Sequence, residues 1–72
     1  MNMTVDELNK EQLESLKRSY LDELVDEGVF AEIMDVDFDE PTDEMLENIN
    51  DYVSDDTIFE HYDGVIFTED DF

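Results

Sequence analysis

The chain has 72 residues and no cysteine, and its 24 acidic residues against 3 basic ones give a formal net charge of −21. This length suits one small domain, residues 1–72, with a thin core, and the missing cysteine excludes disulfides and thiolate metal sites. The charge excludes direct binding of nucleic acid, because carboxylates repel phosphates, and it disfavours an anionic membrane surface. Hydrophobic residues make up 40% of the chain, which favours a folded domain over a disordered acidic tail.

The first predicted helix runs from Lys10 to Glu27. Asn9 fits its N-cap with Gln12 three residues later, and Gly28 suits the left-handed residue after the helix end. Apolar residues recur at helical spacing along it and predict a buried stripe: Leu13, Leu16, Tyr20, Leu21, Leu24 and Val25.

Residues 29–38, VFAEIMDVDF, are ambiguous, because VFAEIM fits a helical turn and VDFD alternates like a short strand. A second helix is predicted from Asp43 to Val53. Its expected core face holds Met45, Ile49, Tyr52 and Val53.

Ser54 fits the N-cap of a third, short helix that carries Ile58, Phe59 and Tyr62 and ends at Gly64. The tail beyond it leans toward extended structure, with residues 65–67 expected to dock on the core. The predicted fold class is therefore mainly α, a small bundle of about three helices with a short extended tail. An α+β fold with a small two-stranded element is the alternative.

Carboxylates gather on the side of the second helix opposite its apolar face, and again near the end of the first helix. Like charges four residues apart destabilise a helix, by about 0.2–0.5 kcal/mol per pair, so this pattern indicates a surface that a partner recognises. An acid at every fourth position gives one charge per ~6 Å of helix axis, at 1.5 Å rise per residue. A DNA strand presents one phosphate per ~3.4 Å of duplex axis, which agrees within about a factor of two.

Two other chemistries fit the sequence less well. Asp35, Asp37 and Asp39 match the first ligands of a calcium loop, but Glu40 stands where the loop needs glycine and Leu46 where it needs glutamate. The one histidine, His61, has no nucleophile beside it, and a chain this small can hardly enclose a pocket. We expect no enzyme activity, no cofactor and no bound metal.

The segments LNKEQLESLKRSY (8–20) and SDDTIFEHYDGVIFTEDDF (54–72) resemble small acidic proteins of phages and mobile elements in Firmicutes. In size and charge the chain is also similar to anti-CRISPR and anti-restriction inhibitors that mimic DNA. That likeness implies a protein that occupies the DNA-binding groove of a nuclease. It rests on no aligned motif, so no site residues are carried over from these families.

The sequence therefore predicts an inhibitor that mimics DNA and binds a basic DNA-binding protein, with a CRISPR effector subunit as the leading candidate. The expected binding residues are these acids, together with two aromatic residues as exposed anchors: Asp22, Glu23, Asp26, Glu27, Glu40, Asp43, Glu44, Glu47 and Asp51, with Phe38 and Phe72. The alternative is an acidic adaptor that binds a basic protein or peptide through its exposed aromatic residues.

The opening MNMTVDEL lacks the basic and apolar segments of a signal peptide, and no apolar run reaches the length of a membrane span. We therefore expect the protein in the cytoplasm of the host bacterial cell. The sequence leaves open whether it is a monomer or a dimer.

Overall fold

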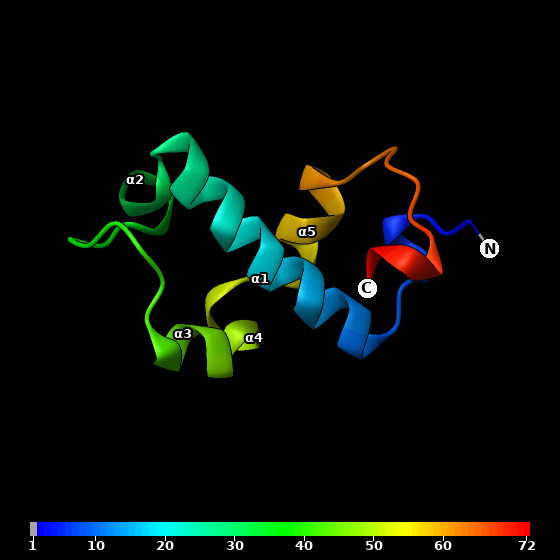
Figure 1. The fold of residues 1–72 in the computed structure, drawn as a ribbon, viewed down its shortest axis with the longest axis horizontal. Helices are drawn as coiled ribbons and strands as arrows, with labels where there is room; N and C mark the ends of the chain where they lie inside the picture. Colours follow the sequence, from blue (N-terminus) through cyan, green and yellow to red (C-terminus); the bar gives the residue numbers. More distant parts are fainter. Residues whose placement is uncertain (1) are drawn as a thin grey trace.

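The structure, a computed structural model, describes residues 2–72. One long helix, α1, runs through the middle of the molecule and the shorter elements pack around it (Figure 1). In chain order the elements are η1 (Val5–Glu7), α1 (Lys10–Glu27), α2 (Phe30–Met34), α3 (Asp43–Glu47), α4 (Ile49–Tyr52), α5 (Asp55–His61) and η2 (Glu69–Asp71). The prediction of a mainly helical domain is confirmed.

Helix α1 begins and ends where the sequence predicts, because its ends are specified locally. The Asn9 side chain accepts from the Gln12 N–H (2.9 Å), and the Gln12 side chain accepts from the Asn9 N–H (3.0 Å). At the other end Gly28 has a φ of 73°, and its N–H bonds back to the helix. A side chain is strained in this left-handed region, so glycine ends the helix here.

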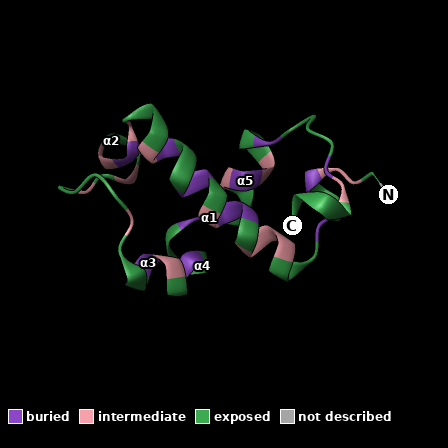
Figure 2. Ribbon diagram, in the orientation of Figure 1, coloured by how far each residue is buried: buried purple, intermediate pink, exposed green. Residues whose placement is uncertain are grey.

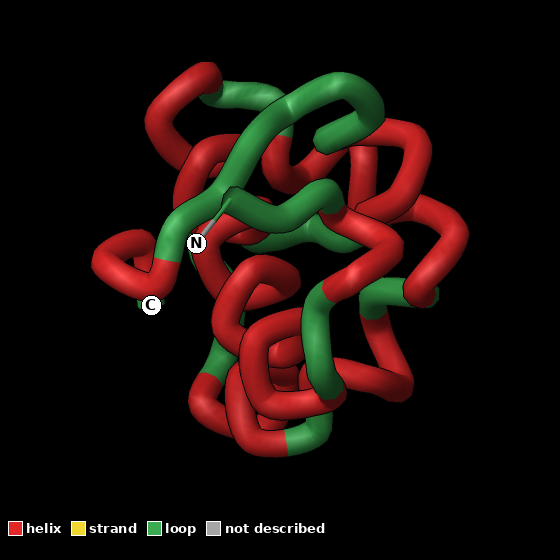
Figure 3. The backbone as a smooth tube through the Cα atoms, turned by 90° about the vertical axis from the view of Figure 1, so that its right-hand side faces the viewer, coloured by secondary structure: helices red, strands yellow, loops and turns green. Residues whose placement is uncertain are grey.

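The core lies between α1 and the elements around it (Figure 2). Its fully buried large side chains come from four different helices: Leu21, Phe30, Ile49 and Ile58. The described chain contains one isolated antiparallel bridge, between Met3 and Phe67, and no sheet. This bridge places the two ends of the chain side by side, as the view from that end shows (Figure 3).

Residues 29–38, left open between helix and strand, divide into the short helix α2 and a loop. Asp35 ends α2 in the left-handed conformation, with a φ of 57°. The third predicted helix is confirmed as α5, where the Ser54 Oγ accepts from the Thr57 N–H (3.2 Å). Gly64 follows it with a φ of 81°.

The prediction of one helix from Asp43 to Val53 is wrong, because the chain leaves helical geometry at Asn48 and forms α3 and α4 instead. The Leu46 carbonyl, which a continuous helix would pair with the next turn, accepts a hydrogen bond from Arg18 Nε (3.0 Å). Asn48 also bonds back to the Glu44 carbonyl through its side chain (3.1 Å). The Glu44 carbonyl also keeps its helical bond from the Asn48 N–H (2.9 Å), so only the Leu46 carbonyl is satisfied from outside the helix.

Two other predictions of burial are wrong. Tyr52, expected in the core, is 41% exposed and its hydroxyl lies beside Glu44, although Ile49 and Val53 of the same predicted face are buried. Val65 and Ile66, expected to dock, are also exposed, since only Phe67 of that segment turns inward beside Met3.

Candidate functional site

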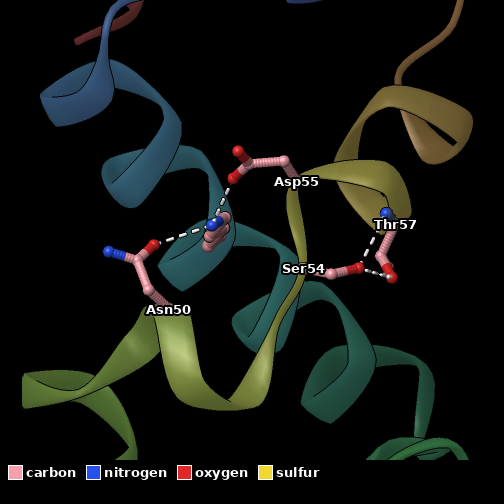
Figure 4. A network of polar contacts seen from close by, with 5 residues as sticks. Asn50, Ser54, Asp55 and Thr57 are labelled. Carbon is pink, nitrogen blue, oxygen red and sulfur yellow. Dashed lines mark hydrogen bonds and ion pairs between the residues drawn. The ribbon is translucent and has the colours of Figure 1, made fainter.

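Two of the chain's three basic side chains point into the molecule. Lys17 is only 2% exposed, and its Nζ donates to Asn50 Oδ1 (2.7 Å) and lies 2.6 Å from Asp55 Oδ1 (Figure 4). Arg18 is half-buried and donates to the Leu46 carbonyl. Lys10 is the remaining base, and it is exposed. The outer surface therefore carries carboxylates with almost no compensating positive charge.

The nine acids predicted as binding residues are all exposed, but they do not form one row. Four of them lie on α3 and α4, and we call these four the acidic face: Asp43, Glu44, Glu47 and Asp51. Glu40 lies in the loop before it. The regular spacing of about 6 Å expected from a continuous helix is interrupted at Asn48.

Glu14 of α1 joins this face. It lines the same open hollow, of about 220 Å³, as Glu47 and Asp51. Sequence reasoning missed Glu14, although Arg18 lies one helical turn further on and contacts α3 through Leu46. Residues four apart share one side of a helix, so Glu14 and Arg18 both face α3 and α4. Placing Glu14 beside α3 and α4 requires knowledge of the tertiary contact of Arg18, which the sequence does not reveal.

Glu23 lies elsewhere, against α5. Its carboxylate accepts from the Tyr62 hydroxyl (3.1 Å) and lies 3.1 Å from His61 Nε2. The His61 ring stacks edge-on between Tyr20 and Tyr62, at centroid distances of 4.8 and 4.7 Å. Glu23 therefore joins α1 to α5 and is engaged within the fold.

Burial, followed by the charge of Glu23 and its hydrogen bond, raises the pKa of the Tyr62 hydroxyl well above its usual range. The neutral phenol is thus strongly favoured, and it donates to the Glu23 carboxylate. This hydrogen bond is a structural link between α1 and α5.

The remaining α1 acids, Asp22, Asp26 and Glu27, are exposed on the second half of that helix. None of them lines the hollow that holds Glu14, Glu47 and Asp51. The structure therefore brings Glu47 and Asp51 together with Glu14 around one hollow, and these three α1 acids line no part of it.

Tyr52 is an aromatic residue within the acidic face. Its hydroxyl lies 3.5 Å from Glu44 Oε1, and the charge of Glu44 is the main cause that raises the pKa of Tyr52. Smaller contributions come from burial, that hydrogen bond and Asp51. An exposed ring beside two carboxylates suits a cationic side chain, which the ring face and the charges attract together.

The two aromatic residues predicted as exposed anchors are both 42% exposed. Phe38 lies in the loop between α2 and α3, with its ring 6.2 Å from that of Phe30. Phe72 ends the chain, with its ring 5.9 Å from that of Phe67. The loop between α2 and α3 and the C-terminus lie in opposite halves of the molecule (Figure 1), so the two residues do not form one patch.

Within residues 2–72 no three His, Asp or Glu side chains are arranged to hold a metal ion. Asp35, Asp37 and Asp39 therefore do not form a calcium site in this structure. Over the same residues no helix has both the length and the apolar character needed to cross a bilayer. Comparisons with protein-family models, with curated proteins and with solved structures found no match.

Proposed function

We propose that the protein is a DNA mimic that occupies the basic DNA-binding groove of another protein and so blocks DNA binding. The observation that carries this proposal is the match between its charge and its length. The molecule measures 39 × 22 × 21 Å. A DNA duplex carries one charge per ~1.7 Å of axis, so 39 Å of duplex carries about 23 negative charges, against a net −21 here.

The inward direction of Lys17 and Arg18 supports the same proposal. A basic groove that approaches the protein meets carboxylates and few repelling cations, as it would on DNA. The carboxylates are also fixed to a folded scaffold, so little further ordering is needed when they are bound. At one hollow in this surface, Glu47 and Asp51 of the acidic face converge with Glu14 of α1.

The proposed partner is a host-defence nuclease complex, with a CRISPR effector as the leading candidate. Such an effector reads duplex DNA in a cleft lined by basic side chains, and it must bind DNA before it can cleave. This choice follows the resemblance to phage and mobile-element proteins expected from residues 8–20 and 54–72. The inhibitor would compete with target DNA and would modify nothing.

Competition with DNA tests the proposal. Purified protein, added to a CRISPR effector bound to a fluorescent target duplex, should displace the duplex. Displacement should weaken as sodium chloride rises, because charges on the two surfaces are screened over about 8 Å at physiological salt. Failure to displace the duplex at low salt from any of a panel of basic DNA-binding effectors would overturn the proposal.

Charge reversal locates the binding surface. The double variant Glu44→Lys/Glu47→Lys should weaken displacement about tenfold or more, because it places two cations on the acidic face. Glu69→Lys/Asp70→Lys changes the net charge equally in η2, at the other end of the molecule, and is the matched control (Figure 1). Glu14 is unsuitable as a control, because it lines the same hollow as Glu47. Equal effects of the two double variants would mean that total charge, and not the acidic face, determines binding.

The exposed apolar residues of the tail favour a second candidate, an acidic adaptor that binds a basic protein or peptide. Val65, Ile66 and Phe72 are exposed close to one another in the sequence. For such an adaptor, Ile66→Ser/Phe72→Ala should reduce partner binding more than Glu44→Lys/Glu47→Lys does. A larger effect of the charge reversal would favour the DNA mimic.

A further inference from the structure

An open groove lies between the end of α1, the start of α2 and the loop that leads to α3. Its volume is about 920 Å³. Val25, Phe30, Phe38 and Pro41 supply its apolar lining, and Asp39 and Glu40 supply two carboxylates. The groove therefore combines an aromatic surface with negative charge, separately from the acidic face.

The walls of this groove are held in place by the fold. Phe30, 1% exposed, is fixed in the core, and the Phe38 ring packs against it. The loop is fixed at both ends, because the N–H of Asp35 bonds to the Ala31 carbonyl and the Thr42 hydroxyl accepts from the Met45 N–H (3.2 Å). The groove is thus formed before any partner binds.

We infer that this groove binds an arginine side chain of the basic partner. A guanidinium is planar, stacks on aromatic rings and carries several N–H donors, so it can lie against Phe38 and face the carboxylates of Asp39 and Glu40. A lysine ammonium is more strongly hydrated and lacks a planar face, and it would use the carboxylates without the ring. Charge complementarity selects a cation, and the exposed ring selects arginine.

The inference rests on the proposed function only for the identity of the partner, since a basic DNA-binding groove supplies the arginine. The groove itself can be tested without that partner. The probes are two nine-residue peptides, one all arginine and one all lysine, which carry equal charge. The wild-type chain should bind the arginine peptide about two- to fivefold more tightly than the lysine peptide in a fluorescence-anisotropy titration.

A leucine in place of the ring separates stacking from charge. Phe38→Leu keeps an apolar side chain against Phe30 and preserves the net charge, so it should reduce the preference for arginine without weakening lysine-peptide binding. Phe72→Leu is the matched control, because Phe72 is equally exposed, at 42%, and also packs against a buried phenylalanine. It should retain the preference. The inference is overturned if wild type shows no preference, or if both variants change it equally.

The carboxylates have their own matched pair. Asp39→Asn/Glu40→Gln should reduce arginine-peptide affinity more than Glu69→Gln/Asp70→Asn, which removes the same charge from the other end. Equal losses would overturn the role of the two groove carboxylates.

DNA competition separates the two proposals. If Phe38→Leu competes with DNA as well as the wild type does, the arginine-binding groove is refuted and the DNA mimic stands. If the chain prefers the arginine peptide but displaces no DNA, the DNA mimic is refuted and the arginine-binding groove stands.

Discussion

Lys17 Nζ lies 2.6 Å from Asp55 Oδ1, and this contact joins the middle of α1 to the first turn of α5. The lysine side chain is 3% exposed and the aspartate 58%, so the pair is desolvated on one side only. Loss of the carboxylate would leave a buried ammonium with Asn50 as its main partner. Such a loss costs more than that of an ordinary surface pair.

We therefore expect Asp55→Asn to lower the free energy of unfolding by about 1–2 kcal/mol in urea denaturation. Asp56→Asn is the control, because Asp56 lies beside it in the same first turn and carries the same charge. Both changes weaken the favourable contact of a carboxylate with the helix N-terminus, so their difference reports the ion pair. Equal losses would show that Lys17 gains nothing from Asp55.

Self-repulsion among the carboxylates predicts an unusual response to salt. Raising sodium chloride from 0.01 to 0.5 M reduces the screening length from about 30 Å to a few ångströms, and should raise the melting temperature. A gain of about 1 kcal/mol corresponds to roughly 4–8 °C for a domain of this size. Glu44→Gln/Glu47→Gln, which removes two charges of the acidic face, should melt higher at low salt and gain less from added salt. An unchanged melting temperature across this range would contradict the repulsion.

Tyr62 predicts how stability depends on alkaline pH. Its pKa in the fold is raised above the ordinary value of 10.0, so the folded chain retains a proton that the unfolded chain has lost. Stability from this group is therefore fully present below about pH 10 and is lost as the pH rises further. Tyr62→Phe removes the hydrogen bond to Glu23 and should cost about 1 kcal/mol at pH 8. The difference in unfolding free energy between wild type and variant should shrink by pH 11, whereas a constant difference would argue against the raised pKa.

The sequence predicts those parts of the fold whose causes are local. The bounds of α1 follow from the paired caps of Asn9 and Gln12 and from the glycine at 28, and α5 begins at Ser54 for the same kind of reason. The break at Asn48 coincides with a distant contact, because Arg18, 28 residues before Leu46, donates to the Leu46 carbonyl. The periodicity of apolar residues carries no information about this contact, so it predicted one continuous helix.

The candidate site divides in the same way. Exposure of the acids follows from their charge, and the sequence was sufficient to predict it. Their grouping depends on which side of α1 each neighbouring helix covers: Arg18 contacts α3 and Glu23 contacts α5. For that reason the sequence did not predict that Glu14 lies beside the acidic face. It also did not predict that Glu23, named as a binding residue, contacts His61.

Arg18 supplies the last prediction, because its hydrogen bond to Leu46 holds α3 against α1. Arg18→Met keeps much of the buried stem and removes the donor, so we expect a loss of about 1–2 kcal/mol. Amide protons of α3 and α4 should exchange with solvent faster than in the wild type. Those of α5 should exchange no faster than the lowered global stability requires. Lys10→Met removes the same charge at an exposed position and should leave this exchange pattern unchanged. If Arg18→Met retains wild-type protection in α3 and α4, then the position of the acidic face does not depend on this bond.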